Sequence, residues 1–281
     1  MNIGITGQNG FIGGSVAQAV SKAGHQVLNL DKCTRSGTFK ELDLRGCAAD
    51  LDWVLHFAAK TSIEASFAGP FSTYSNNLGS TLLALNIAYH TRAAFLFMSS
   101  YVYGIPKYLP IDEKHPTNPV NPYMGSKLAG EEICLQLSKM MEIPLVILRG
   151  FNIYGNCKTP GRLISDVVDA VRNRAPIVVN DAVPKRDYLY IKDFNSLVSR
   201  IVSEKPPITG TYNVGYGHSY SNLEVAEMAR RLSRDESPIV VNSRPRSKDI
   251  LDCSVDVRLI KKTFSWSPMY PLEKGLRELI R

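Results

Sequence analysis

The sequence predicts an α/β protein built on a Rossmann-type, doubly wound parallel sheet, with a smaller mixed α/β region in its C-terminal part. Two patterns support this prediction. Short apolar runs of strand length alternate with helical patterns through the first half of the chain, which is typical of a parallel sheet covered on both faces. A glycine-rich turn joins the first strand pattern to the first helical pattern, and an acidic residue follows the second strand pattern.

The composition is ordinary for a globular protein, with 44% hydrophobic and 21% charged residues among 281. No apolar run reaches the roughly 18 residues of a membrane helix, and the first residues show no export-signal pattern, so we expect a protein that is not exported. The five cysteines are scattered without a Cys-x-x-Cys pair, which favours free thiols in a reducing cytoplasm. The net charge of +7 is modest and dispersed, so it favours anionic ligands without predicting nucleic-acid binding. We therefore expect a cytoplasmic protein with no metal, membrane or nucleic-acid partner.

The glycine-rich turn Gly7-Gln-Asn-Gly-Phe-Ile-Gly13 follows an apolar strand at 2–6 and precedes a helical pattern at 15–22. Glycines allow a backbone to approach a pyrophosphate closely, and a helix N-terminus offers it free N–H groups. A second strand pattern at 26–30 ends at Asp31, eighteen residues after Gly13. This strand–turn–helix–strand arrangement predicts a dinucleotide site.

Asp31 bears on which dinucleotide is bound. A carboxylate at this place accepts hydrogen bonds from the adenosine ribose and repels a 2′-phosphate, which favours NAD. Lys32 and Arg35 follow closely and could receive that phosphate, so NADP stays possible.

Further strand patterns at 53–59, 94–98 and 144–148 alternate with helical patterns at 72–90 and after residue 122. In such sheets, ligands bind outside the carboxyl ends of the strands. Four candidate residues lie at or near these ends, namely Gly7, His56, Ser99 and Arg149.

From about residue 156 the pattern becomes a mixture of helices and short strands. We assign residues 1–155 to an NAD(P)-binding Rossmann domain and residues 156–281 to a smaller substrate-binding cap region. Some segments of that region are expected to return to the Rossmann domain, because no flexible linker separates the two.

Tyr123 and Lys127 lie four residues apart in a helical pattern that begins after Asn121-Pro122, so they share one helix face. A neighbouring ammonium lowers the pKa of a tyrosine from its usual value of about 10, which makes Tyr123 a candidate general acid/base. A surface tyrosine packed on a lysine stem has the same spacing. The spacing alone leaves both interpretations open.

An ordered set of motifs decides between them. It comprises Gly7-x-x-Gly10-x-x-Gly13, Asp31, Asp43, His56-Phe-Ala-Ala59, Asn77, Ser99, Tyr123-x-x-x-Lys127, Arg149-x-x-Asn152-x-Tyr-Gly155 and Arg186-Asp187. In this order, over essentially the whole chain, the set resembles the extended short-chain dehydrogenase/reductases. Within them it resembles the NAD-dependent nucleotide-sugar epimerase/dehydratase family, of the UDP-glucose 4-epimerase type.

The resemblance implies a catalytic site of Ser99, Tyr123 and Lys127. Tyr123 would take the proton of a sugar hydroxyl while hydride passes to the nicotinamide, and Lys127 would bind the nicotinamide ribose and depress the tyrosine pKa. Ser99 would hydrogen-bond the reacting hydroxyl, with Ser100 as the runner-up for that role.

The resemblance also implies the binding residues. It assigns the cofactor to Gly7, Asn9, Gly10, Phe11, Ile12, Gly13, Asp31, Lys32, Asp43, Leu44, Phe57, Ala58 and Ala59, together with Tyr123 and Lys127. It assigns a nucleotide-diphosphate sugar to Ser100, Asn152, Arg186 and Arg246, because two arginines can clamp a diphosphate bidentately.

Several reactions are compatible with this site. Dehydratases of the family place an Asp-Glu pair where this chain has Ser100 and Tyr101, and epimerase-reductases place a cysteine at Tyr101, so both reactions are disfavoured. An NAD-dependent 4-epimerase is favoured, and an NAD(P)H-dependent reductase of nucleotide 4-keto sugars is the alternative. A third reading is a dinucleotide sensor without turnover. Relatives often dimerise through two long helices, here about 72–90 and 123–140, so we expect a homodimer.

Overall fold

The computed structural model describes residues 1–32, 50–156, 160–234, 236–242 and 250–281. The chain forms two compact units, each assembled from separate segments. The first unit contains Met1–Gly104, Thr117–Gly150 and Asn195–Tyr212, and the second contains Ile105–Pro116, Phe151–Phe194 and Asn213–Arg281. The sequence-based division at residue 155 falls close to the change of unit at residue 150.

The first unit is built on a sheet of strand order β2-β1-β3-β4-β5-β9. The pairs β1–β2, β1–β3, β3–β4 and β4–β5 are parallel, which confirms the predicted Rossmann-type sheet. Its strands are β1 (Asn2–Thr6), β2 (Gln26–Asn29), β3 (Trp53–His56), β4 (Ala94–Ser100), β5 (Leu145–Gly150) and β9 (Gly210–Val214), of which β9 ends in the second unit.

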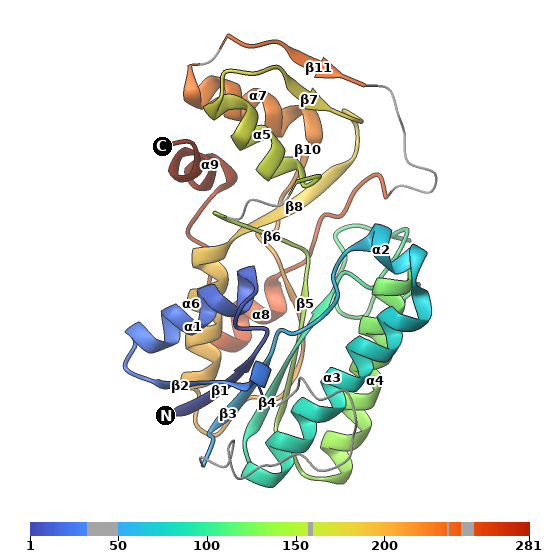
Figure 1. The fold of residues 1–281 in the computed structure, drawn as a ribbon, viewed down its shortest axis with the longest axis vertical. Coiled ribbons are helices and arrows are strands. Elements are labelled where there is room, and N and C mark those ends of the chain that lie inside the picture. Colours follow the sequence, from blue (N-terminus) through green and yellow to red (C-terminus); the bar gives the residue numbers. More distant parts are fainter. Residues whose placement is uncertain (33–49, 157–159, 235, 243–249) are drawn as a thin grey trace. The chain divides into compact units, whose positions relative to one another are not determined.

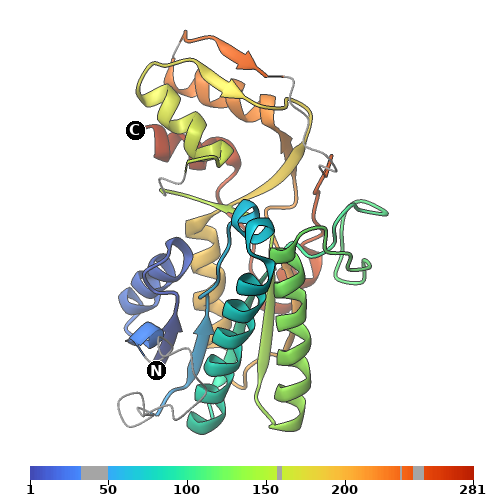
Figure 2. The same cartoon turned by 45° about the vertical axis from the view of Figure 1, so that its right-hand side comes forward.

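Helices cover both faces of this sheet. Figure 1 shows α1 (Phe11–Lys22) on one side and α3 (Pro70–Thr91) and α4 (Pro122–Met140) on the other. The last two lie side by side in Figures 1 and 2, with the short α2 (Ile63–Ala68) at their end. Between them and the sheet lies a core of buried apolar side chains, including Val54, Ile87, Phe95, Phe97 and Ile147.

The start of α4 follows from local chemistry. Pro122 fills the first helical turn, where its missing N–H costs nothing. The Asn121 side chain accepts the N–H of Met124 at 2.9 Å and so satisfies one of the free donors of that turn. These two residues place Tyr123 in the first turn of the helix.

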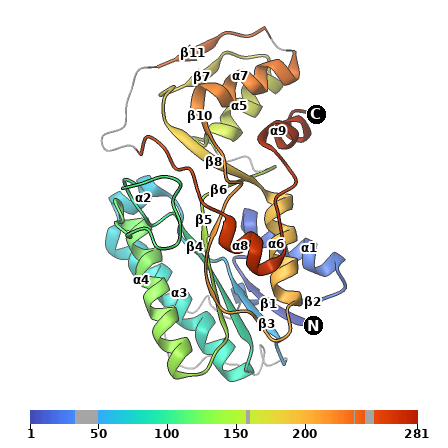
Figure 3. The same cartoon turned by 180° about the vertical axis from the view of Figure 1, so that it is seen from behind.

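The second unit is mixed α/β, as predicted. Its two small sheets have the strand orders β10-β8-β6 and β11-β7. Figure 3 shows α5 and α7 side by side against β7. The strands are β6 (Asn152–Tyr154), β7 (Ile177–Val179), β8 (Lys185–Tyr190), β10 (Ser219–Ser221) and β11 (Ile239–Val241), and the helices are α5 (Leu163–Arg172), α7 (Asn222–Ser233), α8 (Arg258–Phe264) and α9 (Leu272–Ile280).

Helix α6 (Ile191–Ser203) begins in the second unit and continues into the first. Within the first unit, its Asn195 amide donates to the Ser15 hydroxyl of α1 at 2.8 Å. The chain therefore returns to the Rossmann unit after the first five strands of its sheet are complete.

Candidate active site

The glycine loop connects β1 to α1 and requires glycine at two positions. Gly7 has a φ of 72°, and a Cβ on it would come within 2.6 Å of the backbone nitrogen of Ala58. A Cβ on Gly13 would come within 2.2 Å of the Gly7 carbonyl oxygen. Among the described residues no side chain caps α1, and its first turn holds no acidic residue. The N–H groups of that turn are therefore suited to an anionic group.

Asp31 lies in the 3-10 turn η1 (Leu30–Lys32) that follows β2. Its carboxylate accepts the Gly7 N–H at 2.5 Å and, through the other oxygen, the backbone and side-chain N–H groups of Asn9 at 3.4 and 3.3 Å. A carboxylate is an acceptor that suits a ribose hydroxyl as a donor. The glycine loop and Asp31 therefore fit a dinucleotide cofactor, and a carboxylate at this position favours a free ribose hydroxyl over a phosphate.

Most of the remaining residues expected to bind the cofactor lie at the start of α1 and after β3. Phe11 and Ile12 open α1 after Gly10, and Ala59 follows β3. Phe57 and Ala58 donate their N–H groups to the carbonyl and hydroxyl of Thr6, at 3.1 and 3.3 Å. Three assigned positions cannot be compared, because Asp43 and Leu44 lie outside the described residues and the Lys32 side chain is not described.

His56, at the end of β3, is fully buried between two threonines. Its Nδ1 lies 2.7 Å from the Thr6 hydroxyl and its Nε2 lies 3.1 Å from the Thr81 hydroxyl. Thr81 donates its single proton to the Asn77 carbonyl at 2.7 Å, so it must accept from Nε2–H. Burial, aided by the charge of Lys127, lowers the pKa of the imidazole well below its usual value. The ring is therefore neutral, and Nδ1 accepts from Thr6.

Asn77 connects the segment after β3 to the start of α4. Its Oδ1 accepts the Lys60 N–H at 2.8 Å, and its amide donates to the Lys60 carbonyl and the Ser126 hydroxyl at 3.2 and 2.9 Å. Ser126 in turn donates to the Tyr123 carbonyl at 2.8 Å. An unbroken series of hydrogen bonds thus extends from the end of β1 to the turn of α4 that carries Tyr123.

Lys127 lies one turn after Tyr123 on the same face of α4. Tyr123 is half-buried, whereas Lys127 is only 3% exposed and its Nζ lies 4.1 Å from the centre of the Phe97 ring. Burial lowers the pKa of the Lys127 ammonium to about 8, although the charges of Cys134 and Glu131 oppose the fall. A cation so close in sequence to a phenol favours the phenolate form.

Glu131 continues this face of α4 by one more turn and binds two strands of the sheet. It accepts the Ser99 hydroxyl of β4 and the Arg149 guanidinium of β5. The Nε of Arg149 lies 3.1 Å from both carboxylate oxygens and one Nη lies 2.7 Å from Oε2. Burial opposes the charge of Arg149, but its hydrogen bonds to Glu131 hold the pKa of the guanidinium above its usual value.

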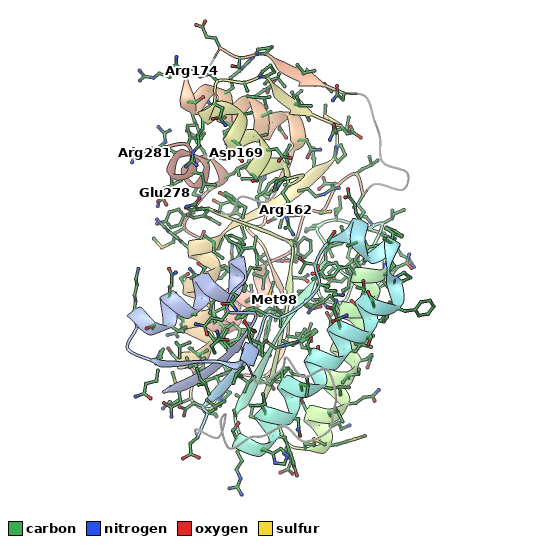
Figure 4. The ribbon with its side chains drawn as sticks, viewed as in Figure 1. Met98, Arg162, Asp169, Arg174, Glu278 and Arg281 are labelled. Carbon is green, nitrogen blue, oxygen red and sulfur yellow. The ribbon has the colours of Figure 1, made fainter. Side chains whose placement is uncertain are left out.

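This Ser99–Glu131–Arg149 cluster was not predicted from the sequence. Ser99 and Arg149 are register partners on β4 and β5, so the sheet itself brings them side by side. Met98, labelled in Figure 4, marks the position of β4 just before Ser99. The spacing of Glu131, four residues after Lys127 and eight after Tyr123, was the available signal that it shares their helix face.

Of the expected substrate residues, Ser100 ends β4 in the first unit, and Asn152 and Arg186 lie in the second unit. The Asn152 amide donates to the Asp187 carbonyl at 3.1 Å, and the Arg186 guanidinium donates to the carbonyls of Ile250 and Lys185 at 2.6 and 2.9 Å. Asn152 and Arg186 lie on neighbouring strands, because β6 pairs with β8. Arg246 lies outside the described residues.

The described residues contain no group of three or more His, Cys, Asp or Glu side chains arranged to hold a metal ion. No helix among them has the length and apolar character needed to span a membrane. Cys134 and Cys253 are buried free thiols, and the other three cysteines lie outside the described residues.

A model of the NAD dependent epimerase/dehydratase family matches residues 3–215. Among characterised relatives, the UDP-glucose 4-epimerase of Bacillus subtilis (strain 168) is 28% identical over 326 residues, covering 99% of this chain and 94% of that protein. The dTDP-D-glucose 4,6-dehydratase of Mus musculus is 26% identical over 314 residues, covering 98% of this chain and 86% of that protein.

Solved structures match over the same length. The UDP-glucose 4-epimerase of Thermotoga maritima with UDP-glucose has a TM-score of 0.90 at 21% identity, covering 100% of this chain and 97% of that one. RMD from Pseudomonas aeruginosa, complexed with NADPH, has a TM-score of 0.88 at 26% identity, covering 99% and 97%. The first likeness bears on the fold alone.

Proposed function

Because the chain belongs to the NAD-dependent epimerase/dehydratase family, we propose that it is a nucleotide-sugar 4-epimerase with NAD as its cofactor. One observation supports this activity above all others. Helix α4 presents a half-buried tyrosine, Tyr123, one turn from a fully buried lysine, Lys127, whose pKa is lowered to about 8. That pairing suits a tyrosine that gives up and regains a proton near neutral pH.

In this proposal, bound NAD supplies the acceptor and then the donor of hydride at C4 of the sugar. Tyr123 takes the proton of the C4 hydroxyl. It returns the proton after the 4-keto sugar has rotated so that its opposite face receives the hydride. Lys127 keeps positive charge beside the phenolate and binds the nicotinamide ribose. A serine hydroxyl at the end of β4, Ser99 by the family spacing, hydrogen-bonds the reacting oxygen.

The substrate in this proposal is a nucleoside-diphosphate sugar, with UDP-glucose as the first candidate. The Bacillus subtilis relative is named for this substrate class. Asn152, Arg186 and Arg246 would bind the diphosphate, and the planar guanidinium groups suit its oxygen atoms. Arg186 already donates through Nη1 to two backbone carbonyls, so its guanidinium orientation is set by the protein.

Dehydration is disfavoured by the residues beside Ser99. Tyr101 occupies a position where dehydratases of the family carry an acidic residue, and its hydroxyl donates to the Gly104 carbonyl at 2.5 Å. Neither Ser100 nor Tyr101 supplies the carboxyl group that would expel water from the sugar.

A reductase of nucleotide 4-keto sugars is the second candidate. The observation that favours it is the 26% identity to RMD, whose structure holds NADPH. The two activities differ in cofactor handling, because an epimerase regenerates its NAD in each turnover and a reductase consumes NAD(P)H.

The first experiment measures both properties on one preparation. The purified protein is denatured and the supernatant is assayed for NAD, while the native protein is assayed for conversion of UDP-glucose to its 4-epimer. Stoichiometric NAD with conversion supports the epimerase. Protein free of NAD that oxidises NADPH in the presence of a nucleotide 4-keto sugar supports the reductase and contradicts the epimerase.

The Tyr123→Phe variant tests the chemistry. It removes the acid/base hydroxyl, so we expect kcat to fall by about 10²–10⁴-fold while bound NAD and the melting temperature stay unchanged. Turnover equal to that of the wild type would contradict the proposal. The dinucleotide sensor remains an alternative that predicts no turnover from either protein.

A cytoplasmic homodimer completes the proposal. Helices α3 and α4 expose Tyr89, Leu135 and Met140, which are 46%, 45% and 76% exposed in the single chain. Burial of these side chains between two copies would remove apolar surface from water. Light scattering on the eluting protein measures the oligomeric state directly.

A further inference from the structure

Asp187 is a fully buried carboxylate on β8, and it is the residue after Arg186. The reaction proposed above gives its side chain no part. Its Oδ1 accepts the N–H of Tyr216 at 2.6 Å, and its Oδ2 accepts the N–H of Gly217 at 2.8 Å. The carboxylate therefore joins β8 to the turn between β9 and β10, residues 215–218, by two hydrogen bonds that are charge-assisted when the carboxyl group is ionised.

The turn approaches the carboxylate too closely for a larger residue at its first position. A Cβ on Gly215 would come within 2.8 Å of the Asp187 Oδ1 and within 2.5 Å of a methyl carbon of Val255. After the turn, β10 pairs antiparallel with β8, and Ser219 lies opposite Asp187. The hydrogen bonds of Asp187 therefore support both the turn and the pairing of β10 with β8.

The backbone of Asp187 lies next to both of the substrate residues expected on these strands. Arg186 precedes it, and the Asn152 amide of the neighbouring β6 donates to its carbonyl oxygen at 3.1 Å. Successive side chains of a strand point to opposite faces, so the carboxylate lies on the face of β8 opposite the Arg186 guanidinium. Asp187 is therefore bonded to Asn152 and continuous with Arg186, while its own side chain is bound to the turn.

We propose that Asp187 is a positioning residue for the substrate diphosphate, because its carboxylate holds the strand that carries Arg186 and anchors Asn152. This inference rests on the proposed function, in which those two residues bind the diphosphate. A guanidinium binds two phosphate oxygens only within a narrow range of orientations, so a small shift of β8 weakens the contact. Asp187 is 0% exposed, so it acts through these residues and does not touch the ligand. Its loss is therefore expected to weaken binding and to leave the chemical step intact.

The Asp187→Asn variant tests this role at pH 8, where the wild-type carboxyl group is ionised. The oxygen of an asparagine still accepts one of the two N–H groups, but its NH2 group cannot accept the other. We expect the KM for UDP-glucose, and the Kd of UDP measured by isothermal titration calorimetry, to rise by about 10-fold, as for groups that orient ligand-binding residues at metal sites. We expect kcat and the amount of bound NAD to stay close to wild-type values.

Asp193→Asn is a matched control. Asp193 is 2% exposed, belongs to the same unit and accepts the backbone N–H groups of Met269 and Tyr270 at 2.8 and 2.9 Å. It lies six residues after Asp187, in the first turn of α6. The same substitution therefore removes the same kind of contact from another part of the second unit, and we expect wild-type KM and Kd.

Gly215→Ala disturbs the carboxylate without changing Asp187. The added methyl would lie 2.8 Å from Oδ1, which is too close for a Cβ, so the carboxylate or the turn must move. We expect the KM for UDP-glucose to rise and kcat to be retained. This variant decides the matter if Asp187→Asn does not fold.

Four results would overturn the positioning role of Asp187. Wild-type KM and Kd in Asp187→Asn, or in Gly215→Ala where the first variant does not fold, contradict it and leave the proposed function intact. An equal rise in Asp193→Asn contradicts it too, because the effect would then belong to any buried carboxylate of the second unit. A fall in kcat with unchanged KM would place Asp187 in the chemical step instead. If the wild type neither converts UDP-glucose nor binds UDP, the proposed function fails and this inference falls with it.

Discussion

The first and second units each bury a carboxylate, and they hold it in different ways. Glu131, in the first unit, is paired with the Arg149 guanidinium through three contacts of 2.7–3.1 Å. Asp187, in the second unit, is 0% exposed and accepts backbone N–H groups of Tyr216 and Gly217 at 2.6 and 2.8 Å. One is held by an opposite charge and the other by peptide dipoles.

The surroundings of Asp187 have a consequence for its pKa. Burial raises the pKa of Asp187 to about 7, because its backbone hydrogen bonds offset only part of the lost hydration. The cluster around Glu131 includes a guanidinium that stays charged throughout the working range of the protein. The second unit therefore contains a carboxylate that titrates near neutrality, and the first unit holds its carboxylate against a guanidinium.

The largest effect is expected from breaking the ion pair. Arg149→Met keeps much of the side-chain volume but leaves Glu131 buried without its countercharge. We expect the free energy of unfolding to fall by about 3–5 kcal/mol, as when one partner of a buried pair is removed. Urea denaturation followed by circular dichroism measures it. A loss below about 1 kcal/mol would mean that Glu131 is not held as a buried charge.

The next effect concerns the pH dependence contributed by Asp187. Its folded pKa of about 7 lies above its model value of 3.8, so between these pH values the folded protein holds a proton that the unfolded chain has released. The contribution of Asp187 to stability is therefore greatest below pH 4 and is lost as pH rises to 7, by about 4 kcal/mol. Above pH 7 it no longer changes.

The Asp187→Asn variant isolates this contribution, because an amide does not titrate. We expect the stability of the wild type to fall more steeply than that of the variant between pH 4 and pH 7, with parallel curves above pH 7. Denaturant midpoints measured at intervals of half a pH unit decide the matter. Parallel curves over the whole pH range would mean that the pKa of Asp187 in the folded protein is not raised, which would contradict this prediction.

The smallest effect tests how much neutral hydrogen bonding adds to the ion pair. Tyr103→Phe removes the hydroxyl that accepts from Arg149 at 3.0 Å and keeps the ring, whose centre lies 5.2 Å from the guanidinium carbon. We expect a loss of about 1 kcal/mol in the free energy of unfolding. A loss as large as that of Arg149→Met would instead make the tyrosine an equal member of the cluster.

Local patterns predicted much of the first unit from the sequence. The Asn121-Pro122 pair correctly predicted the start of α4, and the spacing of Tyr123 and Lys127 predicted that they share one face of that helix. The glycine turn and Asp31 predicted the loop between β1 and α1, and the Gly7 N–H does donate to the Asp31 carboxylate. These features depend on residues close in sequence or on a recurring strand–turn–helix unit.

Long-range partners could not be predicted in the same way. The contact of Ser99 with Glu131 depends on the packing of α4 against β4, and that of Arg186 with Ile250 joins residues 64 positions apart. Periodicity gives the face of an element but not the residue that meets it. The sequence-based expectation for Asn152 and Arg186 as diphosphate ligands therefore stays a prediction, as does that for Arg246.

The hydrogen bonds around His56 have a consequence for motion. Hydrogen bonds connect four separate segments here, through Thr6, His56, Thr81, Asn77 and Ser126. In the bonds through the imidazole, the donor and acceptor at one nitrogen determine which group donates at the other. A local opening at any of these residues leaves a buried donor or acceptor without a partner in the next segment. The glycine loop and the turn bearing Tyr123 should therefore open together, and the amides of Ala58 and Lys60 should exchange their hydrogens at a common rate.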